Sequence, residues 1–208
     1  MNLNVPNYGK RNSQRLPNYH RMDINLTLVP EKKNKKIESI EVLTFLDDGR
    51  SIKWLLEAGC TVQNLLTKGS MNHLKYQLKK TPSNHFKDIL KTITRAEENN
   101  IQTNIYLEDW SNGYRDKPEY VYNLMGHLEG LDIKHVMLPD TLGVLSPEEV
   151  FDSLKDMTSR FQWATIDFHP HNDYGLATAN CLYAVKAGIR NLHCTMTVSY
   201  THLRAHET

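Results

Sequence analysis

The amino-acid sequence predicts an α/β fold in which a parallel sheet curves into a barrel. From Ile37 onward, short β-branched or apolar runs alternate with amphipathic helical patterns, and this alternation is typical of parallel sheets. Polar residues also follow nearly every predicted strand. A barrel draws its active site from several strand ends, whereas an open doubly wound sheet concentrates it at one point, commonly beside a glycine-rich turn. The sequence contains no G-x-G-x-x-G. The polar residues that follow the predicted strands are Lys68, Ser70, Glu108, Asp109, Asp140, Thr141, His169, His171 and Thr197.

Six segments are predicted strands, and each of the first five is followed by a helical pattern. They are Ile40–Phe45, Val62–Leu66, Gln102–Leu107, His135–Leu138, Ala164–Phe168 and Asn191–Met196. Because a complete (βα)8 TIM barrel has eight strands, the sequence predicts an incomplete barrel of about six βα units.

Three of the predicted helices have recognisable ends. Pro82 suits a first helical turn, where its missing N–H needs no partner. The helix after it has one apolar face, formed by Phe86, Ile89, Leu90, Ile93 and Ala96. Ser146 and Glu149 have the spacing of a capping box. Another helix spans Gly175 to Ala187, and Gly188 is expected to end it in the left-handed conformation.

The two ends of the chain differ from this pattern. Residues 1–36 are rich in Asn, Arg, Lys and Pro and have no apolar period, so we expect loop or disorder and assign no domain there. The barrel domain is expected to span residues 37–197. Residues 198–208 resemble a translated sequencing adapter, so the histidines in this tail are not interpreted as ligands.

Composition excludes several classes of function. Of 208 residues, 39% are hydrophobic and 24% charged, which is ordinary for a protein with a buried core. A net charge of +1 gives no field that attracts nucleic acid or an acidic membrane. No apolar run is long enough to span a bilayer or serve as a signal peptide. The widely spaced Cys60, Cys181 and Cys194 are expected to be reduced thiols in a cytoplasmic protein.

The strongest local motif is F-H-P-H-N-D at residues 168–173. Residues i and i+2 of a strand point to the same side, so His169 and His171 are predicted to share one space. Two imidazoles there are suitable ligands for a divalent metal, provided that an oxygen donor joins them. The alternative is a pair of histidines hydrogen-bonded in a loop, and spacing by itself favours neither. Asn172 and Asp173 could support the ligands or cap the next helix.

Three further clusters are ambiguous by themselves. Glu108 and Asp109 could act as a general base or a metal partner, or form a solvated acidic loop. Thr141, beside Asp140, could bind a substrate carboxylate or belong to an ordinary βα turn. Ser70 and His73 are the third cluster. Ser70 is a good helix N-cap, and His73 would then lie in the first turn over the barrel or simply on the surface.

Together these segments resemble a known family. H-P-H-N-D-Y-G-L-A-T-A-N at residues 169–180, followed by A-V-K-A-G at 184–188, is similar to the HxHND-x-GLAxAN…AxxAG signature of acetyl-CoA-condensing barrel enzymes. These are the 2-isopropylmalate, homocitrate and citramalate synthases, to which 3-hydroxy-3-methylglutaryl-CoA lyase is related. Residues 138–143 resemble the family's PDT-x-G, residues 107–109 its S-x-E-D, and residues 70–78 its S-x-x-H…Y-x-L. The resemblance extends over about residues 36–197 in the same order.

The resemblance implies an acyltransferase that converts an acyl group to an alkyl group, as 2-isopropylmalate synthase does in leucine biosynthesis. Its substrates would be acetyl-CoA and a 2-oxo acid. It implies that His169 and His171 bind a divalent metal, either Mg, Mn or Zn, that polarises the substrate carbonyl. It also implies that His73, Glu108 and Thr141 line the 2-oxo acid pocket as its binding and catalytic residues. The intact enzyme would be a homodimer.

The chain also departs from the family. The R-D-G-E-Q segment of the first strand, which supplies an Asp ligand and a catalytic Arg, is not found, and D-D-G-R at residues 47–50 follows what resembles the third strand. The family's final T-x-x-G-x-G-E-R-x-G-N is replaced after Thr195. We therefore expect this 208-residue chain to be an inactive or nearly inactive piece of a synthase.

The 2-oxo acid is left open, so a homocitrate or citramalate synthase is an alternative within the same reaction. Two alternatives of other kinds remain. The first is a lyase of the same barrel family that cleaves a carbon–carbon bond, and the second is a barrel-derived module that binds a metal or ligand without turnover. The runs Y-L-E-D-W-S-N-G at residues 106–113 and N-L-L-T-K-G-S at residues 64–70 resemble the synthases more than the lyase.

Overall fold

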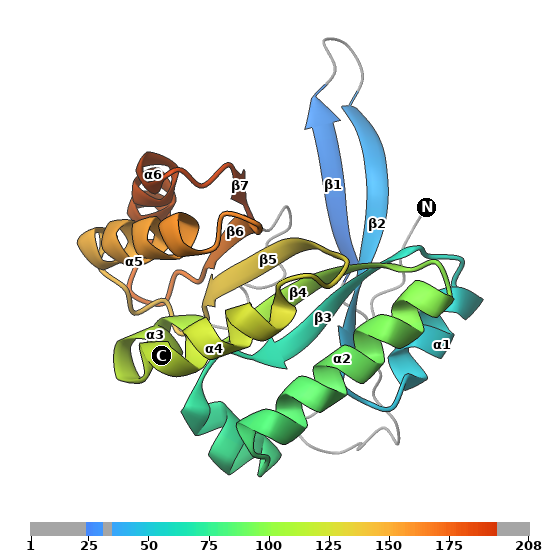
Figure 1. The fold of residues 1–208 in the computed structure, drawn as a ribbon. Coiled ribbons are helices and arrows are strands. Elements are labelled where there is room, and N and C mark those ends of the chain that lie inside the picture. The colour runs from blue at the N-terminus through green and yellow to red at the C-terminus, as the bar shows by residue number, and fades with distance from the viewer. Residues whose placement is uncertain (1–23, 31–34, 195–208) are drawn as a thin grey trace, which may run out of the picture.

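A single sheet organises the protein. The computed structural model describes residues 24–30 and 35–194, with side-chain surroundings for residues 40–194. Seven strands lie in the sheet in the order in which they occur along the chain, as Figure 1 shows. They are β1 (Ile24–Pro30), β2 (Lys35–Phe45), β3 (Val62–Lys68), β4 (Gln102–Glu108), β5 (Ile133–Asp140), β6 (Thr165–Pro170) and β7 (Asn191–Leu192). The first pair is antiparallel, and all later neighbours are parallel.

The strand order identifies the sheet as a barrel wall. From β2 to β7 it never reverses, so the sheet has no switch point of the doubly wound type. Within the described residues, β7 does not pair with β2, and the barrel is incomplete, as the sequence predicts.

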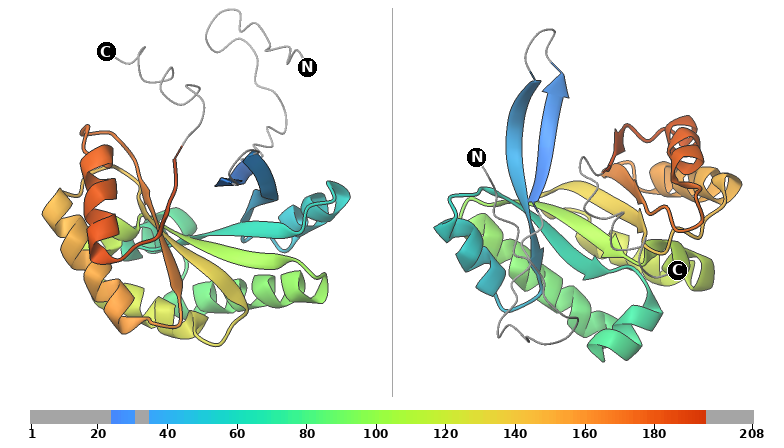
Figure 2. Two further views of the ribbon diagram at one scale, coloured as in Figure 1. Left: turned by 90° about the horizontal axis from the view of Figure 1, so that it is seen from above. Right: turned by 180° about the vertical axis from the view of Figure 1, so that it is seen from behind.

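The helices lie along the outer face of the curved sheet (Figure 2). None of the described helices is long and apolar enough to cross a bilayer. They are α1 (Arg50–Glu57), the π-helix η1 (His73–Leu78), α2 (Pro82–Glu98), α3 (Trp110–Asp116), α4 (Pro118–Leu128), α5 (Pro147–Arg160) and α6 (Ala177–Ala187).

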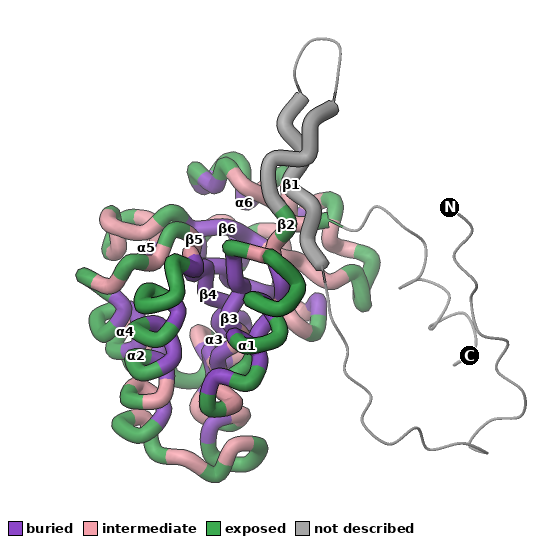
Figure 3. The backbone as a smooth tube through the Cα atoms, turned by 90° about the vertical axis from the view of Figure 1, so that its right-hand side faces the viewer, coloured by how far each residue is buried: buried purple, intermediate pink, exposed green. Residues whose placement is uncertain are grey.

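The hydrophobic core lies between the sheet and the helices. Leu65, Ile105, Val136, Leu138 and Phe168 come from four successive strands and are buried there. Figure 3 shows that these strands, β3 to β6, are largely buried. Because side chains alternate along a strand, the residues between them face the interior of the barrel. This interior face of the sheet is polar near the carboxyl ends of the strands.

The predicted helix ends agree with the structure, apart from one start. The Thr81 side chain accepts a hydrogen bond from the Asn84 N–H where α2 begins at Pro82, and Ser146 forms both halves of the capping box. Gly188 ends α6 with a φ of 107°. That helix starts at Ala177, two residues later than predicted, where the Asn172 carboxamide oxygen accepts from the Ala177 N–H.

Residues 1–36 require a correction. Ile24–Pro30 is a strand paired with β2, and β2 itself begins at Lys35, where the sequence analysis expected loop or disorder. Alternating Ile24, Leu26 and Leu28 are the sequence signal for this strand. At the other end, the strand predicted at Asn191–Met196 is described only for Asn191–Leu192. Residues 1–23, 31–34 and 195–208, which include Thr197 and the tail, lie outside the described residues.

Candidate functional site

The two histidines of the strongest motif lie together at the end of β6. The rings of His169 and His171 have centroids 5.0 Å apart and are tilted by 59°, so both imidazoles occupy one space. Burial, and then the neighbouring histidines His171 and His193, lowers the pKa of His169 to about 3. His169 is therefore neutral at physiological pH, which is the form that binds metals.

The His169 ring also has a nitrogen that is suited to bind a metal. Its Nδ1 atom is buried without a hydrogen-bond partner, and a buried nitrogen in this state is costly unless something binds it. Two imidazoles are too few to hold a divalent ion. Among residues 40–194, no group of three or more His, Cys, Asp or Glu side chains is placed to hold one. His169 and His171 thus fit as two ligands of a larger set.

The loop after β5 packs directly against these histidines. The His171 N–H donates to the Asp140 carbonyl oxygen over 3.2 Å. Gly143 has a φ of 62°, and a Cβ there would lie 2.7 Å from the His171 carbonyl oxygen. Only glycine fits this position without strain, because the backbone is left-handed and the neighbouring loop is too close for a side chain.

Asp140 belongs to an ordinary βα turn, the less specific of the two roles predicted for the Asp140–Thr141 segment. Its carboxylate accepts from the N–H groups of Val144 and Leu145 over 3.1 and 3.0 Å, as in an ordinary βα turn. Thr141 instead points to another loop, where its Oγ1 accepts from the Asp109 N–H over 2.9 Å.

Glu108 forms an ion pair with Lys68, its register partner on β3. The pair is largely buried, since the Lys68 side chain is 12% exposed and that of Glu108 23%. The Lys68 N–H donates to His85 Nε2, and its carbonyl oxygen accepts from the Tyr120 hydroxyl. Sequence reasoning lists Lys68 among the polar strand ends but gives it no role, because the pairing depends on strand register.

His85 supports this arrangement by remaining neutral. It is fully buried, and burial lowers its pKa to about 4, with the charge of Lys80 acting in the same direction. A neutral imidazole has one acceptor nitrogen, and here Nε2 accepts from the Lys68 N–H.

Asp109 connects two of the predicted pocket residues. Its carboxylate accepts from the Ser70 hydroxyl over 2.6 Å and lies 3.5 Å from His73 Nε2. Its N–H donates to Thr141. Ser70 also accepts from the His73 N–H, which is the capping contact predicted for it. His73, Glu108 and Thr141 therefore belong to adjoining parts of one corner, although no contact joins all three directly.

A second buried carboxylate lies deeper in the barrel. Asp167 accepts from His135 Nδ1, from Asn191 Nδ2 and from His193 Nε2, over 3.1, 2.9 and 3.3 Å. The Tyr106 hydroxyl is 2.7 Å from His193 Nδ1. The rings of Tyr106 and His193 both pack against His169.

The ionisation of this group follows from its contacts. Burial raises the pKa of Asp167, but the hydrogen bonds from His135, His193 and Asn191 outweigh it and lower the pKa overall. The hydrogen bond to Asp167 raises the pKa of His135. Sequence reasoning misses these residues. A usable signal is that Asp167 precedes His169 by two positions and so faces the same interior.

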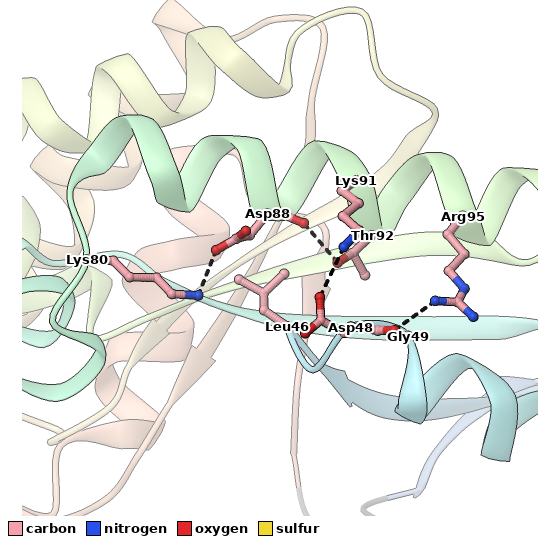
Figure 4. A pocket seen from close by; sticks show the side chains of 8 residues that line it. All are labelled: Leu46, Asp48, Gly49, Lys80, Asp88, Lys91, Thr92 and Arg95. Carbon is pink, nitrogen blue, oxygen red and sulfur yellow. Dashed lines mark hydrogen bonds and ion pairs between the residues drawn. The ribbon is translucent and has the colours of Figure 1, made fainter.

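A different polar region lies between α2 and the turn after β2 (Figure 4). It is a cavity of about 120 Å³ lined by Leu46, Asp48, Gly49, Lys80, Asp88, Lys91, Thr92 and Arg95. Its three cationic side chains are paired within it. Lys80 contacts Asp88 at 2.7 Å, Lys91 contacts Asp48 at 3.1 Å, and Arg95 donates to the Asp48 carbonyl oxygen. These contacts fix the turn to α2.

Comparison with known proteins identifies relatives over most of the chain. The model of the HMGL-like family matches residues 32–197. The 2-isopropylmalate synthase of Gloeothece citriformis is 34% identical over 127 residues, which are 60% of this chain and 23% of that protein. The homocitrate synthase of Sulfolobus acidocaldarius is 28% identical over 151 residues, which are 71% of this chain and 32% of that protein.

Solved structures agree on the fold. An HMG-CoA lyase from Bacillus subtilis superposes with a TM-score of 0.64 at 24% identity, over 72% of this chain and 51% of that chain. The chain spans about a quarter to a third of the length of the curated relatives described above.

Proposed function

This chain belongs to the HMGL-like family. We propose that its function is that of an acyltransferase, which condenses acetyl-CoA with a 2-oxo acid as a 2-isopropylmalate synthase does. The family includes both synthases and lyases. The observation that supports the proposal best is the pair of imidazoles at the end of β6, with the β5–α5 loop packed against it. Both segments are motifs shared with the synthases.

The metal is part of the proposal. Enzymes of this family generally use a divalent metal, and the neutral His169 and the adjacent His171 are suitable donors for one. When bound, such a metal supplies Lewis-acid polarisation of the substrate carbonyl.

The remaining residues bind and orient the 2-oxo acid. Thr141 accepts from the Asp109 N–H, so its own hydroxyl proton can be donated to a substrate carboxylate. The Lys68 ammonium group has three donors, of which Glu108 uses one. The other two are suited to an anionic substrate oxygen. Glu108, held beside Lys68, is the carboxylate placed to accept a proton, and His73 lines the same corner.

We further propose acetyl-CoA as the second substrate, a homodimer as the assembly, and leucine biosynthesis as the pathway. These assignments follow from the resemblance of the sequence motifs to those of the 2-isopropylmalate synthases.

The test is free CoA released from acetyl-CoA, measured with a thiol reagent on the protein as its gene encodes it. Reactions with 2-oxoisovalerate, pyruvate and 2-oxoglutarate are run with and without chelator. We expect chelator-sensitive release with 2-oxoisovalerate. Release only with 2-oxoglutarate or pyruvate would assign a homocitrate or citramalate synthase instead. Formation of acetyl-CoA from 3-hydroxy-3-methylglutaryl-CoA, with no condensation, would overturn the proposal in favour of a lyase.

A further inference from the structure

Asp109 has a more specific role than its place beside Glu108 indicates. We propose that Asp109 is a positioning residue that fixes the His73 imidazole and the Thr141 hydroxyl at the 2-oxo acid pocket. The inference rests on the proposed function for the identity of the substrate. Its evidence is the geometry of one buried corner.

The carboxylate has more partners than a surface aspartate. Oδ2 accepts from the Ser70 hydroxyl over 2.6 Å and lies 3.5 Å from His73 Nε2, while Oδ1 accepts from Asn112 Nδ2 over 2.7 Å. Asp109 is only 4% exposed. A buried carboxylate is tolerated only when it is hydrogen-bonded in this way.

The backbone at Asp109 is strained. Its φ and ψ are 63° and 27°, in the left-handed region that residues other than glycine seldom adopt. Asp109 also occupies the N-cap position of α3, yet its side chain makes no capping hydrogen bond to that helix. A simple cap would turn the carboxylate towards the helix N–H groups. Here one oxygen contacts Ser70 and His73, and the other accepts from the Asn112 side chain.

Three loops meet at this residue. Ser70 and His73 follow β3, Asp109 follows β4, and Thr141 follows β5. The Gly69 N–H donates to the Glu108 carbonyl oxygen over 2.7 Å, which brings the first two loops into contact beside Asp109. Strained residues persist where the surrounding structure over-determines them, and they gather at functional sites.

The contacts imply a definite state for His73. A carboxylate near Nε2 favours a proton on that nitrogen and leaves Nδ1 as an acceptor. Asp109 therefore selects one tautomer of His73 while its N–H orients the Thr141 oxygen. Neither effect requires Asp109 to touch the substrate.

The variants Asp109→Asn and Asp109→Gly test this role. Asparagine keeps the size and tolerates the left-handed backbone but removes the charge, and glycine relieves the strain while removing the side chain. The matched control is Asp48→Gly, because Asp48 is also left-handed, with a φ of 57°, but is exposed.

The first readout is the His73 tautomer, measured by ¹⁵N NMR on the histidine-labelled chain at a pH where histidines are neutral. We expect the Nε2–H form in the wild type and in Asp48→Gly, and a mixture of tautomers in both Asp109 variants. An unchanged His73 tautomer in folded Asp109→Gly would overturn the proposal and leave Asp109 a purely structural residue. This measurement needs no activity, so its outcome is separate from that of the proposed function.

The second readout is steady-state kinetics on the active protein. We expect the KM for the 2-oxo acid to rise about tenfold or more in Asp109→Gly, the size typical of a lost supporting residue, while the KM for acetyl-CoA is unchanged. Equal changes in both KM values would contradict the assignment. If the tautomer shifts but the protein turns over no 2-oxo acid, Asp109 positions His73 as proposed, and the assignment of a 2-oxo acid as the substrate is wrong.

Discussion

Two aspartates of this protein have the same backbone conformation and opposite surroundings. Asp48 follows β2 and Asp109 follows β4, and both are left-handed, with φ of 57° and 63°. The Asp48 side chain is 91% exposed and pairs with Lys91, which lowers its pKa through a hydrogen bond. The Asp109 side chain is 5% exposed and is hydrogen-bonded on both oxygens.

The difference shows which polar contacts contribute most to the stability of the fold. Water replaces an exposed partner at little cost, so a surface ion pair contributes about 0–1 kcal/mol. A buried group that loses its partner keeps the full desolvation penalty, which is about 1–3 kcal/mol. The corner formed by Lys68, His85, Glu108 and Asp109 should therefore respond strongly to substitution, and the Asp48 corner weakly.

The largest expected effect is the response of the buried corner to pH. The pKa of His85 falls from an ordinary 6.5 to about 4 on folding. The unfolded chain therefore binds more protons between these values, and stability is lost as the pH falls through that window. The loss attributable to His85 is at most about 3 kcal/mol.

Urea unfolding across this pH range measures the effect. His85→Gln keeps an acceptor for the Lys68 N–H but does not titrate, so its stability should fall less than that of the wild type. The control is His127→Gln, since His127 is exposed on α4. Equal pH dependence in wild type and His85→Gln would refute the burial argument.

The next effect is the loss of a buried ion-pair partner. Lys68→Met leaves Glu108 without its cation. Breaking a fully buried pair costs about 3–5 kcal/mol, and because Glu108 retains some contact with water we expect about 2 kcal/mol. The free energy of unfolding in urea gives the value. A loss no larger than that of an exposed lysine would show that water already screens the pair.

A smaller effect is expected at the loop beside the histidines. Gly143→Ala adds a Cβ that approaches His171 and a left-handed residue that is not glycine. We expect a loss of about 1–2 kcal/mol, and weaker metal binding if His171 is displaced. Gly59→Ala is the control, because Gly59 is also left-handed, with a φ of 70°, and has nothing near its Cβ position. Identical losses in the two variants would mean that strain alone, without the close approach, explains Gly143.

The smallest effect is expected in the exposed corner. Lys91→Met removes the partner of Asp48, and because water replaces that partner, the free energy of unfolding should change only slightly. Raising the salt concentration should reduce even this difference. A change as large as that of Lys68→Met would contradict the distinction between the two corners.

The sequence predicts the elements whose signals are local. The six parallel strands, the capping box at Ser146, Pro82 at the start of α2 and Gly188 at the end of α6 all follow from short-range patterns. The shared space of His169 and His171 follows from strand periodicity.

The contacts that sequence reasoning missed depend on the register between strands and on contacts between loops that are far apart in the sequence. Lys68 meets Glu108 only because β3 and β4 pair at that register. The conformation of Asp109 depends on two neighbouring loops, and the contacts of Asp167 depend on β5 and β7. No local pattern contains this information. The strand β1 is missed for another reason, since polar composition around it outweighs a short alternating run.

The measurement that tests the account most directly is metal binding by the histidine pair. Free Mn²⁺ is followed by electron paramagnetic resonance as the protein, made as its gene encodes it, is added in the presence of 2-oxoisovalerate. We expect the wild type and His127→Ala to reduce the free Mn²⁺ signal, and His169→Ala and His171→Ala to reduce it far less. Equal binding by all four proteins would contradict the assignment of the end of β6 as the metal site.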